Sequence, residues 1–363
     1  MKKLRYIDAL RGLAVLGVLV VHCSKAGKSV YPFMVENVLN FGAMGVQLFF
    51  VISACTLFLS AHKRSNEEQH PGANFFIRRF FRIAPLYYLA IIYYLWQNGT
   101  APNYWTGYEK EVSGWMVGAN FFFLHGLNPY SVNSLVPGGW SISAEMLFYC
   151  LVPLLALKIR NLNAAILFLT GCLVFKSGFD LVLTSKPLIS NIDLWNSFLY
   201  FSLPSQLPVF ALGFIMYFLI FVPEDTAAIN RKYLLVLVIA LMIQLSMGYN
   251  VQHIMFALLA VILGYALSVT DSKMLVNRFT VYVGKLSFSM YLIHFAVLFF
   301  MEKFGWLQLL PPDSVKNSLV NFAFRMALLL PLSMIGASIT YYGIELPTQR
   351  AGKWLIRKIE GKA

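Results

Sequence analysis

Long apolar segments alternate with short polar stretches along nearly the whole chain. Ten of these segments are long enough to cross a lipid bilayer. They cover residues 7–23, 38–60, 80–97, 141–157, 164–183, 197–222, 233–248, 253–270, 286–304 and 319–343. A shorter apolar stretch at 115–128 predicts a re-entrant or half-helix. The pattern predicts an all-α integral membrane protein, a bundle of about ten transmembrane helices.

Composition supports the same class. Of 363 residues, 58% are hydrophobic and only 12% are charged, whereas soluble domains carry roughly 25% charged residues. Lys2 and Lys3 precede an apolar run, as in a signal peptide, but Arg11 and His22 interrupt the ends of that run. We therefore expect a retained first span and a single transmembrane domain over residues 1–363, with no appended soluble domain.

Lysine and arginine positions predict the orientation. With the N-terminus in the cytoplasm, 20 of the 29 fall in inward-facing segments and seven lie on or near the outer side. Both termini are therefore expected in the cytoplasm. The net charge of +13 reflects this topology, and no nucleic-acid partner is expected. The four cysteines lie in or beside apolar segments without CxxC spacing, which predicts no metal site.

An arginine and a histidine share one face of the first span, RGLAVLGVLVVH. Eleven residues turn a helix about 20° past three full turns, so Arg11 and His22 point the same way, about 16.5 Å apart along the axis. Asp8 precedes Arg11 by three residues, and a local ion pair would reduce the cost of burying the cation.

Three arginines, Arg78, Arg79 and Arg82, form a basic face at the cytoplasmic end of the third span. Arginines at this position often only enforce orientation. The alternative is a clamp for phosphates, because guanidinium groups pair with phosphate oxygens.

Other spans also carry polar residues. Glu145 enters an apolar helix after the break at residues 137–139, and intramembrane acids are commonly functional, although it could instead neutralise a buried cation. The ninth span carries a polar stripe of Ser287, Tyr291 and His294 on one face. The stripe could take part in function, or it could join helices through hydrogen bonds. Two further histidines, His125 and His253, are expected to be interfacial or solvated. The sequence does not identify a partner for Arg325.

Two functional classes, an enzyme and a transporter, fit a helical bundle with a polar interior and a basic cytoplasmic end. One is an acyl- or phosphoryl-group transferase that uses a phosphate-bearing cytoplasmic donor. The other is a transporter in which histidine and glutamate relay protons, although the paired repeats typical of transporters are not evident. A scaffold that binds lipid-linked sugars without chemistry is disfavoured by the number of costly intramembrane polar groups.

Six motifs follow one another along nearly the whole chain: IDALRGLAVLGVLVVH, GVQLFFVISACTLFL, FFIRRFFRIAPLYY, GGWSISAEMLFY, SFSMYLIH and a terminal ELP. With these motifs in this order, the chain resembles the acyltransferase-3 family of bacterial membrane acyltransferases. Ala54 replaces the glycine that usually follows Val-Ile-Ser, and the SGNH-hydrolase domain of some members is not expected.

The resemblance implies transfer of an acyl group, usually acetyl from acetyl-CoA, to a hydroxyl of an extracytoplasmic glycan such as O-antigen of lipopolysaccharide or exopolysaccharide. It implies a bacterial cytoplasmic membrane location, an essential Arg11–His22 pair and a second critical site at Arg79 and Arg82. We predict that His22 is a general base or acyl carrier, and that Glu145 orients it or binds the sugar. The remaining site residues are predicted as donor-binding Arg78, Arg79 and Arg82, and as acceptor-lining Trp140, Ser141, Ser143, Tyr291 and His294. Acyl-CoA is expected as a substrate, with no permanently bound cofactor and no metal.

Overall fold

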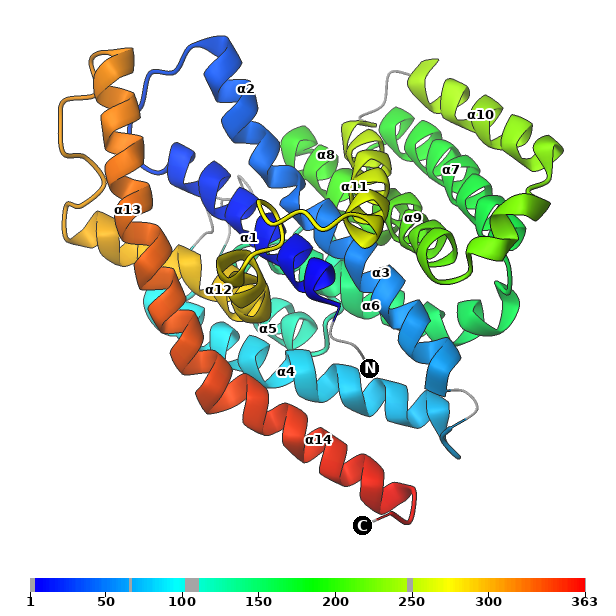
Figure 1. Cartoon of the computed structure of the whole chain (residues 1–363). Coiled ribbons are helices and arrows are strands. Elements are labelled where there is room, and N and C mark those ends of the chain that lie inside the picture. The colour runs from blue at the N-terminus through cyan, green and yellow to red at the C-terminus, as the bar shows by residue number, and fades with distance from the viewer. Residues whose placement is uncertain (1–3, 65–66, 102–110, 247–250, 363) are drawn as a thin grey trace. The chain divides into compact units, whose positions relative to one another are not determined.

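The computed structural model describes residues 4–64, 67–101, 111–246 and 251–362, and every regular element in these ranges is helical (Figure 1). The predicted all-α class is thereby confirmed. The chain divides into two compact units, Met1–Phe49 with Ala266–Thr348, and Phe50–Tyr265 with Gln349–Ala363. We call them the first and second units and describe each by itself.

The first unit combines the beginning of the chain with a later helical pair. Its elements are α1 (Arg5–Lys25), α2 (Phe33–Phe41), the 3-10 turn η1 (Gly42–Met44), the start of α3 (Gly45–Arg64), α12 (Arg278–Lys303), α13 (Val315–Thr340), the π-helical turn η5 (Tyr341–Glu345) and the start of α14 (Leu346–Ile359).

The second unit contains the middle of the chain and its C-terminal helix. Its elements are the rest of α3, α4 (Pro71–Asn98), α5 (Gly114–Phe121), η3 (His125–Leu127), α6 (Gly139–Lys158), α7 (Leu162–Ser185), α8 (Ile192–Phe201), α9 (Leu203–Phe221), η4 (Pro223–Ala228), α10 (Arg231–Ser246), most of α11 (Gln252–Val269) and most of α14.

Eight helical segments in the described residues are long and apolar enough to cross a membrane. The predicted spans at 80–97 and 233–248 correspond to α4 and α10, which are not among the eight; residues 247–248 lie outside the described ranges. The multi-pass membrane class is supported. The count of ten and the cytoplasmic termini remain predictions.

Prolines and glycines divide two of the predicted apolar segments. The segment 197–222 is split at Ser202 between α8 and α9, because Pro204 supplies no backbone N–H and favours the first turn of a new helix. The segment 38–60 begins within α2 and passes through η1 into α3. The predicted half-helix at 115–128 corresponds to the short helices α5 and η3.

Glycines bring α1 and α12 into direct backbone contact. A Cβ built on Gly12 would clash with the carbonyl oxygen of Thr280, and one built on Gly284 would clash with the carbonyl oxygen of Asp8. Small residues allow such close approach between membrane helices, where van der Waals packing replaces the hydrophobic effect. The contact fixes how α1 lies along α12.

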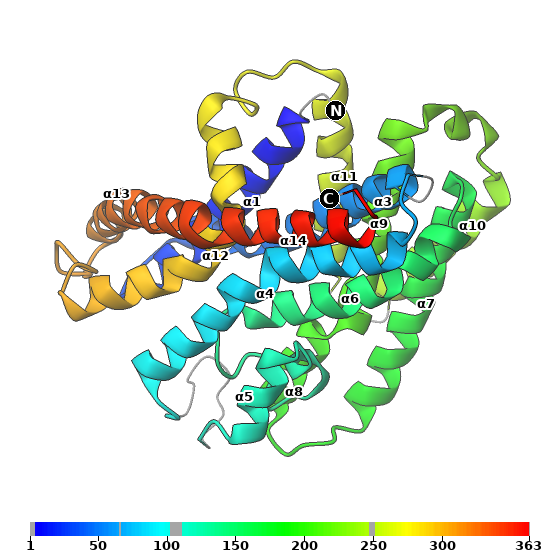
Figure 2. The ribbon, with the colours of Figure 1, turned by 90° about the horizontal axis from the view of Figure 1, so that it is seen from below.

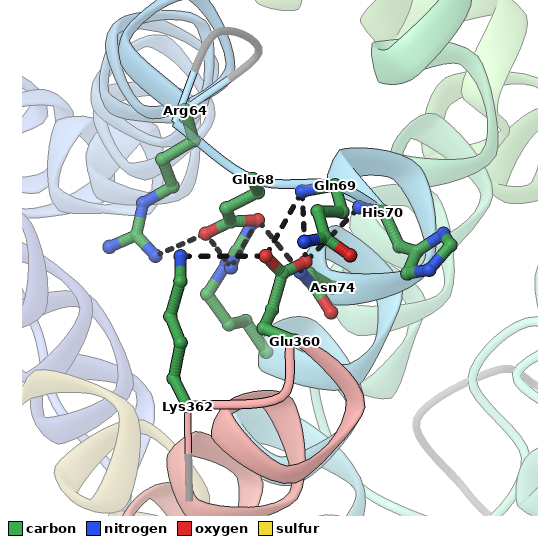
Figure 3. Close-up of polar contacts among 8 residues, drawn as sticks. Arg64, Glu68, Gln69, His70, Asn74, Glu360 and Lys362 are labelled. Carbon is green, nitrogen blue, oxygen red and sulfur yellow. Dashed lines mark hydrogen bonds and ion pairs between the residues drawn. The ribbon is translucent and has the colours of Figure 1, made fainter.

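In the second unit, the C-terminal helix is fastened to the start of α4. Figure 2 shows α14 running alongside α4, and a Cβ on Gly352 would meet the Phe81 side chain at 2.9 Å. The carboxylate of Glu360 accepts hydrogen bonds from the backbone N–H groups of Gln69 and His70, at 3.0–3.1 Å, and from Asn74 Nδ2 at 2.7 Å (Figure 3). A carboxylate is favoured there because the first amides of a helix are otherwise unsatisfied.

Gly284→Ala should destabilise the protein by about 1–3 kcal/mol, because the new methyl group meets backbone that cannot move without separating the helices. Thermal unfolding of the purified protein in detergent measures the effect. Gly178→Ala in α7 is the matched control, since no atom lies within 4 Å of its Cβ position. Equal midpoints for the two variants would show that the α1–α12 contact is not tight.

Glu360→Gln should lower the unfolding temperature at neutral pH and have a smaller effect in acid. The Gln69 N–H and the other donors hold the pKa of Glu360 at about 2, below the usual 4.5. A depressed carboxyl pKa contributes stability that is present above the unfolded-state pKa and lost as pH falls through the folded-state value. Unfolding midpoints of both proteins between neutral pH and pH about 3 should therefore converge on acidification. A pH-independent difference would contradict this assignment.

Candidate functional site

The structure brings His22 of α1 against His294 of α12. Their ring centroids are 5.3 Å apart, and the Phe295 ring lies 4.4 Å from His22 and 4.1 Å from His294. His22 follows Gly12 by ten residues, and His294 follows Gly284 by ten. The two helices run in the same direction (Figure 1). Because the spacing from the glycine contact is equal in both helices, the two histidines lie at the same level.

Hydrogen bonding sets the tautomer of His294. Its Nδ1 lies 3.2 Å from the carbonyl oxygen of Met290, which can only accept, so Nδ1 carries a proton. In the neutral ring Nε2 then holds a lone pair. The residue is fully buried, and Nε2 has no hydrogen-bond partner among the described residues. His294 therefore presents a buried acceptor in the neighbourhood of His22.

The other predicted residues of α1 and α12 lie farther along the same two helices, and only Tyr291 contacts the pair directly. Ser287 and Tyr291 are buried, and the Tyr291 ring lies 6.0 Å from His294, so the predicted polar stripe faces the interior. Arg11 Nη1 lies 3.4 Å from Asp8 Oδ1, and each side chain is 19% exposed. This confirms the predicted local ion pair.

Arg325 is fully buried near the end of α1 and bonds to neutral oxygens. Its guanidinium donates to the carbonyl of Leu307 at 3.2 Å, Ser29 Oγ at 3.1 Å and Tyr31 Oη at 3.0 Å. Within the described part of the chain no carboxylate forms a salt bridge with it. Arg325 thus joins the loop after α1 to the loop after α12, which hold the ends of the two histidine-bearing helices.

A second polar group, the Arg79 cluster, lies in the second unit and contains Arg79, Tyr149, Glu145 and Ser53. Arg79, Tyr149 and Glu145 lie close enough to interact electrostatically, and Ser53 Oγ donates a hydrogen bond to Glu145 Oε1. The Arg79 guanidinium carbon also lies 5.8 Å from the Phe75 ring centroid and 5.9 Å from that of Tyr149, within cation–π range. Glu145 therefore has the half-buried Arg79 cation nearby, in agreement with the structural role that the sequence left open for it.

The three arginines of α4 have different surroundings. Arg78 Nη1 donates to Glu68 Oε1 at 2.7 Å and to Oε2 at 3.1 Å. Arg79 belongs to the Arg79 cluster, and half-buried Arg82 lies close enough to affect the charges of Arg79 and Tyr149. A phosphate ligand would thus compete with a carboxylate at Arg78 and with a phenol at Arg79.

The residues predicted to line the acceptor path at the start of α6 are buried. Trp140 stacks on Phe201 with ring centroids 4.4 Å apart. Ser143 Oγ donates to the Phe123 carbonyl at 2.6 Å and accepts from the Gly126 N–H at 2.9 Å, and Ser141 Oγ donates to the Gly138 carbonyl at 3.0 Å. The Ser141 hydroxyl thereby fastens the glycine turn before α6, and the Ser143 hydroxyl fastens the segment between α5 and η3 to α6.

Two histidines expected near solvent are buried. His125 Nε2 lies 3.0 Å from the Gly139 carbonyl and 3.2 Å from Tyr87 Oη, and burial lowers the pKa of His125 to about 4. It is therefore neutral at physiological pH. His253 Nε2 lies 3.1 Å from the Ser205 carbonyl. The expectation was wrong because both rings satisfy backbone carbonyls of neighbouring segments, which sequence spacing does not reveal.

Comparison with known proteins identifies the family. The acyltransferase domain of the acyltransferase-3 family matches residues 4–342. The chain belongs to this family. The match confirms the resemblance, and its range includes the histidine pair and the Arg79 cluster but ends before the terminal ELP motif.

Similar proteins in other organisms carry related names. "Putative O-acetyltransferase" of Staphylococcus aureus strain COL is 25% identical over 390 residues, and its counterpart in strain MSSA476 is 24% identical. Each alignment covers 97% of this chain but 58% of the relative. The chain thus spans little more than half the length of these acyltransferase-3 relatives. No solved structure matches it.

Some contacts of the acyltransferase-3 site had a sequence signal that was missed. Tyr149 follows Glu145 by four residues on one helix, a spacing that places them on one face. Ser53 and Glu145 lie 92 residues apart, and no local pattern links them. Among the described residues, no three histidine, cysteine or acidic side chains come together as candidate metal ligands.

Tyr149→Phe should destabilise the purified protein by about 1–3 kcal/mol, because the buried hydroxyl lies among the charged groups of the Arg79 cluster and its polar interactions with them are lost. Chemical or thermal unfolding in detergent measures the change. Tyr342→Phe is the matched control, since Tyr342 is 55% exposed. Equal effects of the two substitutions would show that the Tyr149 hydroxyl does not join Arg79 and Glu145.

Proposed function

We propose that this chain is a membrane-bound O-acyltransferase that moves an acyl group, most simply acetyl, from cytoplasmic acyl-CoA to a hydroxyl of an extracytoplasmic glycan or lipid-linked sugar. Family membership supports the acyl-transfer class. The observation that carries the proposal is the His22–His294 pair between two membrane helices. The enzyme would work in a bacterial cytoplasmic membrane with both termini inside.

In the proposed reaction, His22 is the general base. Its neutral imidazole takes the proton of the acceptor hydroxyl as that oxygen attacks the thioester carbonyl carbon. Collapse of the tetrahedral intermediate breaks the carbon–sulfur bond, and His22 returns the proton to sulfur. The products are an ester and free coenzyme A. In the two-step variant, His22 first takes the acyl group itself and the hydroxyl then displaces it.

His294 would act through His22 as a positioning residue. A direct N–H···N bond of about 3 Å between two imidazoles corresponds to ring centroids about 5 Å apart, since each ring adds roughly 1 Å. The observed separation is 5.3 Å, and because Nε2 of His294 has no hydrogen-bond partner among the described residues, the two rings would have to turn toward each other to form this bond. An Nε2 acceptor on His294 would fix which nitrogen of His22 carries the proton and stabilise the imidazolium formed in the reaction, as the third member of a catalytic triad does.

The donor's phosphates would be held by Arg79 and Arg82, with Arg78 joining once its guanidinium exchanges Glu68 for phosphate. Paired guanidinium–phosphate bonds favour arginine over lysine at such a site. Glu145 would set the charge balance of Arg79 through Tyr149. Arg11, three turns before His22 on α1, is proposed as a further residue that contacts the donor.

On the acceptor side, Tyr291 would contact the sugar because its ring lies beside His294. Trp140 would offer an aromatic surface on which a sugar ring can stack. Ser141 and Ser143 would contribute to the acceptor side only by holding the backbone in place, because their hydroxyls are bonded to backbone groups.

His22→Ala should abolish acyl transfer while leaving membrane insertion intact. The test is mass spectrometry of surface glycans from cells that express wild-type protein or the variant at matched membrane levels. An acyl mass increment should disappear with His22→Ala and persist with the control His70→Ala, whose side chain is exposed. An increment that survives His22→Ala would remove His22 from the chemistry. Solute transport in vesicles without any acyl donor would favour the transporter alternative.

Substitution of His294 separates positioning from packing in the same reaction. His294→Phe fills the space without an acceptor and should lower kcat by about 10²- to 10⁴-fold, with little change in KM for the donor. His294→Gln provides an amide oxygen as acceptor and should recover part of kcat. Equal losses in both variants would assign His294 a structural role only.

A further inference from the structure

The outward face of α14 gathers the basic residues of the C-terminal helix. At 100° of rotation per residue, five side chains fall within an arc of about 140° around the helix axis: Arg350, Lys353, Trp354, Arg357 and Lys358. All five are exposed, Trp354 by 59%, and Lys358 Nζ lies 5.4 Å from the Trp354 ring. The result is one basic and aromatic stripe about two and a half turns long.

Two contacts, one within α14 and one just after its last residue, fix the rotation of the helix about its axis. Gly352 packs on Phe81 of α4, and Glu360 bonds to the backbone just before α4, as Figure 3 shows. Turning the stripe inward would break both contacts. The basic face is therefore fixed outward within the second unit.

The charges of the stripe are not neutralised by nearby acids. α14 contains four basic residues and no aspartate or glutamate between Leu346 and Ile359. Among the described residues, none of the four basic side chains forms a salt bridge. Such a surface attracts anions, and its arginines can pair with phosphate oxygens.

Continuity with a membrane span indicates which anions the stripe meets. Val315–Ile359 is helical throughout, a run of 45 residues. At 1.5 Å per residue this is about 68 Å, roughly twice the hydrocarbon thickness of a bilayer. The apolar part lies in α13, and the arginines and lysines of α14 are too costly to bury in hydrocarbon. α14 must leave the bilayer core.

We propose that the α14 stripe binds the headgroups of anionic phospholipids at the membrane surface. An exposed tryptophan among arginines and lysines suits the membrane–water interface, where indole rings accumulate and anionic headgroups attract basic side chains. Because Glu360 ties α14 to the start of α4, lipid bound at the stripe also holds the segment that carries Arg78, Arg79 and Arg82. The inference is independent of the acyl-transfer proposal.

The test uses the full-length protein in nanodiscs that contain phosphatidylcholine and a trace of nitroxide-labelled lipid. The label is placed near the headgroup of either phosphatidylglycerol or phosphatidylcholine. The chain has seven tryptophans, so the Trp354 signal is the difference between wild type and Trp354→Phe. Labelled phosphatidylglycerol should quench Trp354 at lower probe concentration than labelled phosphatidylcholine does. Added salt should reduce the preference.

Charge removal gives the matched comparison. A variant with Arg350→Gln, Lys353→Gln, Arg357→Gln and Lys358→Gln should lose the preference for phosphatidylglycerol over phosphatidylcholine. Each charge removed should weaken the binding of the anionic lipid by roughly fivefold. The control carries Lys63→Gln, Arg160→Gln, Arg231→Gln and Lys232→Gln, four exposed basic residues elsewhere in the second unit, and should retain it. Equal quenching by both probes, or a preference that survives the α14 substitutions, would overturn the proposal. Relief of quenching by coenzyme A in the absence of any lipid preference would instead assign the stripe to the phosphates of a soluble ligand.

Discussion

The backbone contact between Gly12 of α1 and Gly284 of α12 is the constraint on which the histidine site depends. It removes any side chain from between the helices and sets them in parallel at one register. Ten residues farther on in each helix, His22 and His294 meet with ring centroids 5.3 Å apart. A shift of one residue along one helix would move a ring by about 1.5 Å along the axis and turn it by about 100°. Packing of the smallest residues thus specifies the geometry of the polar ones.

Polar groups in this protein are buried together with their partners, and the choice of partner differs between the two units. Arg325 is surrounded by neutral oxygens from two loops, so its charge orders backbone. Arg79 instead has a phenol and, through it, the carboxylate of Glu145. An unpaired buried charge is far more costly than a paired one. The first arrangement suits a fixed structural role, and the second leaves a charge network that a ligand could rearrange.

Sequence periodicity predicted what a single helix determines. The shared face of Arg11 and His22, the Asp8–Arg11 pair and the inward stripe of Ser287, Tyr291 and His294 all follow from spacing. Contacts between distant segments were not predictable, because no local pattern encodes them. The His22–His294 pair joins residues more than 270 positions apart, and so do the Glu360 bonds to the start of α4 and the Arg325 bonds to the loop after α1. The Arg325 bond to Leu307 reaches the loop after α12. His125 and His253 were misplaced for the same reason.

The three arginines of α4 show why a motif does not by itself define a binding site. Their spacing gives one basic face, yet Arg78 is held by Glu68, Arg79 by Tyr149, and Arg82 lies beside Arg79. Positive-inside topology would require only three charges at one end of a helix. It would not require a buried tyrosine and a half-buried glutamate close to the second arginine. These neighbours favour a role in which Glu145 and Tyr149 modify the electrostatic environment of Arg79. A donor phosphate bound to Arg79 would then change the interactions of Arg79 with both residues.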